Sequence, residues 1–147
     1  METQEFFKKW KSDSPKSFEK LKEYLQQYFN NYNIDFDEEY NGAIYSTCSH
    51  YVSEILPFEM LSGIIEKFFE ENSIYYWIEK KYYDYWHYIP KINAVDFEIN
   101  WDEIDKKLDE ISELEYKIQK YKLILLVAEI LEKEWGLNDK KQIQQIL

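Results

Sequence analysis

A chain of 147 residues has the length of one domain, and its formal net charge of −11 makes it strongly acidic. Its single cysteine cannot form an intramolecular disulfide, and a core of this size needs neither a disulfide nor a metal to fold. All 18 basic residues are lysine, so the chain lacks the planar guanidinium that most phosphate-binding and base-reading sites use, and its charge disfavours direct nucleic-acid binding.

The N-terminal segment predicts two short helices. Phe6, Phe7 and Trp10 lie on one side of a helix over residues 2–11. The pair Ser14-Pro15 then combines a capping residue with proline at the first helical position. We therefore expect a second helix that runs to about residue 30.

The next segment predicts a short strand and two further helices. Residues 34–37 alternate in polarity, and Asn41-Gly42 is a turn dipeptide. Apolar residues at helical spacing between Ile44 and Ile55 predict a third helix, which Pro57 closes. A fourth helix is expected from Leu61 to about residue 72.

Residues 74–89 are ambiguous between a helix and a β-hairpin. Their abundant Ile, Tyr and Trp favour strands. Their periodicity favours a helix, which would place Tyr82, Tyr85 and Trp86 in the core and would end at Pro90. A hairpin would have to turn near residues 79–81, which lack the Gly or Asn of tight turns. We expect the helix and keep the hairpin as the alternative.

Residues 95–99 alternate cleanly and predict a short strand, which could pair with residues 34–37 as a two-stranded ribbon. The following residues, 101–135, carry the longest helical pattern of the chain. Asn100 can cap this helix, and Gly136 can stop it. A last helix is expected after Asn138. The sequence thus predicts a single mainly α domain, 1–147, with about six helices packed around one long C-terminal helix. The alternative is an α+β fold with an antiparallel hairpin at 74–89.

The acidic charge falls in two blocks. Residues 34–72 contain nine carboxylates and one lysine, a net charge of −8, and residues 96–115 contain nine carboxylates and two lysines, a net charge of −7. These carboxylates could simply be a solvated surface, and those near residue 101 also favour the dipole of a helix that begins there. The alternative interpretation is a docking face for a basic partner.

No motif in the chain predicts catalysis or a metal site. Cys48 is expected to be a buried thiol. His50 follows two residues later, so on a helix its side chain would point away from Cys48. The pairs His50–Glu54 and Asp84–His87 offer two ligands each, where a metal site needs three or four. Glycine-rich phosphate loops and nucleophile elbows are absent from the sequence. We therefore expect no enzyme, no metal and no cofactor.

Aromatic residues interleave with Lys80 and Lys81 between residues 76 and 88. Such a pattern could stack on single-stranded bases, form the core, or anchor a protein interface.

Short, acidic, aromatic-rich and free of catalytic motifs, the chain resembles mobile-element-encoded inhibitors of nucleases, including anti-CRISPR proteins, in type only and with no family motif matched. The resemblance implies an inhibitor or immunity-type protein that docks on a basic, nucleic-acid-handling partner and blocks it. The residues expected to bind that partner are Asp35, Asp37, Glu38, Glu39, Asp102, Asp105, Asp109, Glu113, Trp77, Tyr83, His87 and Tyr88.

Two alternatives remain at the level of sequence. One is an assembly module that forms a homodimer through Ile104, Ile111 and Ile118 of the long helix. The other is a single-stranded RNA or DNA binder that uses residues 76–88. With no signal peptide and no apolar run long enough to span a bilayer, we expect a cytoplasmic protein, and the absence of arginine suggests an AT-rich bacterial or phage genome.

Overall fold

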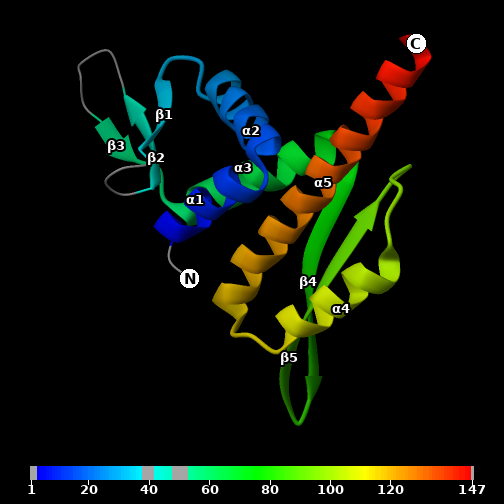
Figure 1. Ribbon diagram of the computed structural model, residues 1–147. Helices are drawn as coiled ribbons and strands as arrows, with labels where there is room; N and C mark the ends of the chain where they lie inside the picture. The colour runs from blue at the N-terminus through cyan, green and yellow to red at the C-terminus, as the bar shows by residue number, and fades with distance from the viewer. Residues whose placement is uncertain (1–2, 38–41, 48–52, 147) are drawn as a thin grey trace. The chain divides into compact units, whose positions relative to one another are not determined.

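The computed structural model describes residues 3–37, 42–47 and 53–146. These residues form two compact units, Met1–Glu71 and Asn72–Leu147. Figure 1 labels the helices and strands of both units.

The first unit combines three helices with a three-stranded antiparallel sheet of order β1-β2-β3. Its elements are α1 (Thr3–Asp13), α2 (Pro15–Tyr28), β1 (Asn33–Asp37), β2 (Ala43–Thr47), β3 (Ser53–Ile55) and α3 (Phe58–Glu71). The first two helices and the fourth predicted helix are confirmed, and α2 begins at the predicted proline, with Ser14 as its N-cap residue.

Aromatic side chains fill the core of the first unit. The Trp10 ring stacks on Phe69 of α3 at 5.5 Å between centroids and contacts the edge of Phe18 at 6.2 Å. The indole N–H of Trp10 donates to Ser17 Oγ at 2.8 Å, and the Ser17 hydroxyl donates to the Ser14 carbonyl at 3.0 Å. The apolar faces predicted for α1, α2 and α3 therefore meet each other through interlocking rings.

The third predicted helix is wrong wherever the structure describes it. Residues 43–47 and 53–55 are strands, with Phe36 opposite Ile44 and Tyr45 opposite Ile55. The sequence Ala-Ile-Tyr-Ser-Thr suits a strand, and β1 supplies the hydrogen-bonding edge that the local helical spacing could not reveal. Cys48 and His50, which were expected on that helix, lie outside the described residues.

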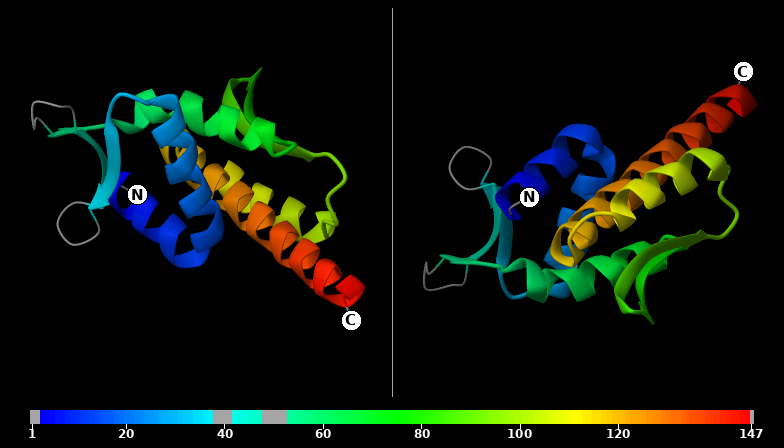
Figure 2. Two further views of the ribbon diagram at one scale, coloured as in Figure 1. Left: turned by 90° about the horizontal axis from the view of Figure 1, so that it is seen from above. Right: turned by 90° about the horizontal axis from the view of Figure 1, so that it is seen from below.

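The second unit consists of one long hairpin and two helices. Its elements are β4 (Ile74–Tyr83), β5 (Tyr85–Ala94), α4 (Trp101–Ser112) and α5 (Tyr116–Ile146). Helix α4 packs on β5, and α5 packs on both strands and on α4. Figure 2 shows α4 and α5 side by side, with the hairpin to one side of them.

The helix expected at residues 74–89 is wrong, and the hairpin alternative is confirmed. The turn lies at Asp84, whose φ of 71° is a conformation that Asp tolerates better than most residues, and not at residues 79–81. Pro90 does not end the segment but lies inside β5, opposite Ile78. A two-stranded ribbon has two outer edges, where the missing N–H of proline costs no ladder bond.

The strand expected at residues 95–99 is also wrong. Within the described residues this segment pairs with no strand and connects β5 to α4, while β1 pairs with β2 instead. The backbone N–H of Val95 donates to the Ser73 carbonyl at 3.0 Å, and Asp96 then turns the chain with a φ of 62°.

The long helix is the main correction, because residues 101–135 form two helices. Asn100 caps α4 as predicted, since its side chain accepts from the Glu103 N–H at 3.3 Å. The chain leaves the helix after Ser112 and re-enters it at Tyr116, and α5 then continues through Gly136 and Asn138 to Ile146. Of the three isoleucines expected to form a homodimer, Ile104 and Ile111 of α4 are buried and Ile118 of α5 is half-buried.

Candidate functional site

The outer face of α4 presents a row of carboxylates to solvent. Ile104, Leu108 and Ile111 are buried on the inner face of the helix. On the opposite face lie Asp102, Asp105, Asp109 and the C-cap residue Glu113, all exposed and three or four residues apart. We call these four residues the carboxylate row.

Lysines form ion pairs with Glu103 and Glu129 near the row but not with the row itself. Lys107 contacts Glu103 at 3.4 Å and Glu129 of α5 at 3.3 Å, and Lys133 contacts Glu129 at 3.4 Å. Burial of the Lys107 ammonium lowers its pKa, but Glu129 and Glu103 outweigh burial, so the pKa of Lys107 lies above its usual range. Among the described residues, no lysine lies within ion-pair distance of a carboxylate of the row.

Apolar side chains flank the row at both ends. Trp101 precedes it and is 39% exposed, and Leu114 follows it and is 38% exposed. Exposed Trp next to charged groups is typical of protein interfaces, where large apolar side chains supply most of the binding free energy.

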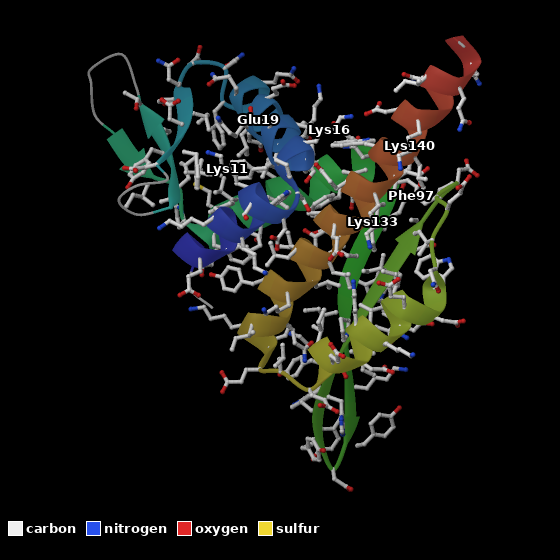
Figure 3. All side chains as sticks on the ribbon, viewed as in Figure 1. Lys11, Lys16, Glu19, Phe97, Lys133 and Lys140 are labelled. Carbon is white, nitrogen blue, oxygen red and sulfur yellow. The ribbon has the colours of Figure 1, made fainter. Side chains whose placement is uncertain are left out.

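A groove of about 210 Å³ lies between α4, α5 and the segment that leads into α4. Its apolar lining is formed by Ile99, Ile104, Leu126, Ile130 and Leu137. Its polar lining includes Glu98, Glu103, Glu129 and Lys133, so the charged groups of the groove sum to −2. Figure 3 labels Lys133 on α5 and Phe97 on the segment that leads into α4. Glu103 and Glu129 are already paired with Lys107, and Glu129 also with Lys133, so the groove offers mainly its apolar lining.

The hairpin has an inner face toward the helices and an outer face toward solvent. The register pairs Ile74 with Ala94 and Ile78 with Pro90, and these pairs lie on the inner face, where Ile74 and Pro90 are buried. Alternate positions of both strands form the outer face, which carries Tyr75, Trp77, Glu79, Lys81, Tyr83, Tyr85, His87, Ile89 and Lys91.

The predicted interface aromatics divide between these two faces. Trp77, Tyr83 and His87 share the outer face, where the His87 ring lies 5.4 Å from Tyr83 and 4.3 Å from Tyr85. Tyr88 lies on the inner face and packs on Tyr116 of α5, with 4.7 Å between the ring centroids. Tyr88 is therefore half-buried against α5 and is not one of the fully exposed rings.

Sequence reasoning missed the exposed aromatics at the end of the hairpin. Tyr82, Tyr85 and Trp86, which the helical pattern assigned to the core, are 64%, 66% and 57% exposed. Their helical spacing is accidental, because strand alternation is the period that applies. The high β-propensity of this segment was the signal that could have found them.

The first acidic block belongs to the first unit. On β1, Asp35 is exposed and Asp37 is half-buried, beside the inward-facing Ile34 and Phe36. Glu38 and Glu39 lie outside the described residues.

The described residues contain no group of three or more His, Cys, Asp or Glu side chains that could hold a metal ion. Asp84 lies at the hairpin turn and His87 lies between two tyrosines, so the expected Asp84–His87 helical pair does not form. In the part of the chain that is described, no helix is both long and apolar enough to cross a membrane.

No protein-family model matches the sequence, and no curated protein or solved structure matches the chain.

Proposed function

We propose that this protein is a non-catalytic inhibitor of immunity type, which docks on a basic protein partner through the outer face of α4. The observation that supports this most directly is the carboxylate row, which forms no ion pair with a described lysine and is flanked by the exposed Trp101 and Leu114. Unpaired carboxylates on a rigid helix accelerate association with a basic protein and select partners by charge.

The spacing of the row also fits a partner that handles nucleic acid. Residues three or four apart on a helix rise about 4.5 to 6 Å along its axis. The charges of one nucleic-acid strand follow each other at about 3.4 Å, a spacing of the same order. A rigid row of this kind occupies a groove that otherwise holds a phosphate backbone, and the partner is thereby blocked.

The experiment compares proteins captured from lysate of the encoding cell by the wild type and by D102K/D105K/D109K. We expect the variant to lose at least about tenfold in affinity for the basic protein that the wild type retains at low salt and releases at high salt. Helicity by circular dichroism should remain, because all three side chains are exposed.

The matched control is D13K/E19K/E23K, which changes the charge equally on α1 and α2, where these acids already pair with Lys9, Lys22 and Lys20. Lysine near the start of α4 also opposes the helix dipole, so D102N/D105N/D109N is included and should fall between the wild type and the lysine variant. Equal affinity of all four proteins for the captured partner would rule the proposal out.

A further inference from the structure

Lysines outnumber carboxylates in the half of the hairpin that contains the turn and at the start of α5. Residues 80–91 contain three lysines and one carboxylate, and residues 116–122 contain three lysines and none, so the two segments sum to +5 in a chain of −11. The two segments are in contact, because Tyr88 packs on Tyr116 at 4.7 Å. Of the three hairpin lysines, Lys80 lies on the inner face with Tyr88, whereas Lys81 and Lys91 lie on the outer face, where Lys81 pairs with Glu79 at 3.6 Å.

Two of these lysines converge on one aromatic ring. The Lys80 ammonium lies 5.2 Å from the Tyr116 centroid and 6.0 Å from the Tyr88 centroid. The Lys120 ammonium lies 5.2 Å from the same Tyr116 centroid, so the two ammonium groups are at most 10.4 Å apart, twice 5.2 Å. In the described part of the chain, neither of them pairs with a carboxylate. Each of these two ammonium groups, without a carboxylate partner, can bind one phosphate of an anionic chain that passes the Tyr116 ring.

Aromatic rings continue from this pair of lysines toward the hairpin turn. Tyr82 and Trp86 face each other across the strands on the same inner face as Lys80 and Tyr88, with 5.4 Å between their rings. In Figure 1 the hairpin runs past the connection between α4 and α5, which leaves this end of its inner face uncovered by the helices of the unit. Both rings are accordingly more than half exposed, at 64% and 57%.

We propose that Lys80, Tyr82, Trp86, Tyr88, Tyr116 and Lys120 form a site for single-stranded nucleic acid, here called the hairpin site. Phosphates of the strand bind the Lys80 and Lys120 ammonium groups, and a base stacks on Trp86 and Tyr82. This combination of cations with adjacent exposed rings is the chemistry of sequence-tolerant single-strand binding.

The overall acidity of the chain does not prevent this binding. At physiological salt, charges more than about 8 Å apart at the surface are largely screened from each other, so the local charge decides. The carboxylate row lies on the face of α4 that points away from the hairpin. An acidic peptide would satisfy the two lysines but would leave the exposed rings without a planar partner, so nucleic acid fits the site better.

The test measures fluorescence anisotropy of a labelled oligothymidine of about ten nucleotides, titrated with the full chain at low and physiological salt. We expect wild-type binding that weakens with salt, and K80Q/K120Q should weaken it about tenfold and reduce the salt dependence. Trp86→Ala should also weaken it about tenfold or more, because a stacked base is lost. Two controls should leave binding unchanged: Lys133→Gln, an exposed lysine elsewhere on α5, and Trp77→Ala on the outer face.

The absence of wild-type binding at low salt would overturn the proposal, and so would equal effects of Trp86→Ala and Trp77→Ala. A labelled glutamate-rich peptide that binds more tightly than the oligonucleotide would assign the site to acidic proteins instead. The hairpin site does not depend on the proposed inhibition, because the α4 variants test that separately.

Discussion

At the scale of single residues, a buried hydrogen bond joins the side chains of Trp10 and Ser17 in the core of the first unit. The indole is fully buried, and its N–H has the Ser17 hydroxyl as acceptor at 2.8 Å. Neither residue type is unusual for a helix, but together they let a large polar-tipped ring enter an aromatic core. The Ser17 hydroxyl is therefore the group that satisfies the buried N–H of Trp10.

We expect Ser17→Ala to lower the free energy of unfolding by about 1–3 kcal/mol, because the Trp10 N–H remains buried without its acceptor. Urea denaturation of the full chain measures this. The matched control is Ser62→Ala, whose hydroxyl makes a similar bond to a carbonyl three residues earlier, but at the surface of α3. Equal losses in the two variants would show that the indole bond contributes nothing.

At the scale of elements, a buried glutamine explains why α4 and α5 are separate helices. The Gln119 side chain is 1% exposed, and its amide N–H₂ donates to the carbonyls of Ser112 at 3.1 Å and Leu114 at 2.9 Å. The end of a helix leaves carbonyls without partners. Gln119 reaches back from the first turn of α5 and satisfies the carbonyl of Ser112, at the end of α4, and that of Leu114, in the connection, so the chain can reverse direction without a glycine or a proline.

Gln119→Met keeps the length of the side chain but removes both donors. We expect it to lower the free energy of unfolding by about 1–3 kcal/mol, since two carbonyls near the turn lose their partner. Gln142→Met, at an exposed position of the same helix, is the control and should be nearly neutral. An unchanged urea midpoint for Gln119→Met would mean that packing alone holds the turn.

At the scale of the whole molecule, two of the described groups, Tyr24 in the first unit and Lys107 in the second, bind their protons more tightly when the chain is folded. Burial and the Glu71 carboxylate, which accepts from the Tyr24 hydroxyl at 3.3 Å, raise the pKa of Tyr24. In the second unit, the pKa of Lys107 is raised overall by Glu129 and Glu103 against the lowering effect of burial. A raised folded-state pKa contributes stability that is complete below the unfolded pKa and is lost as pH rises through the folded value.

The raised pKa values of Tyr24 and Lys107 therefore predict that the free energy of unfolding falls above about pH 10. Between about pH 7 and 9 these two groups should not change it. Urea denaturation at about pH 8 and about pH 10.5 measures it. Tyr24→Phe should reduce the difference between the two pH values, whereas Tyr32→Phe, at an exposed tyrosine, should not. A larger alkaline loss in Tyr24→Phe than in the wild type would contradict the assignment.

Sequence periodicity located most of the buried residues correctly but assigned some of them to the wrong element. Ile104, Leu108 and Ile111 are buried as the helical pattern predicts, and so are Phe6, Phe7 and Trp10. In the hairpin, Ile74 is buried under both the helical and the strand interpretation, whereas Tyr82 and Trp86 are exposed only because the segment is a strand. A short aromatic-rich segment can match both the helical and the strand period, and only the strand with which it pairs decides between them.

The sequence by itself determined the features that act over a few residues: the start of α2 at Pro15, the cap of α4 at Asn100, the inner faces of the helices, and the two acidic blocks. Only the tertiary structure decided the rest. It paired β4 with β5, placed Lys80 and Lys120 against the same Tyr116 ring, and divided one long helical pattern in two, with Gln119 at the turn. These contacts join residues distant in the chain, and their free energy exceeds the small local preferences that a sequence pattern reports.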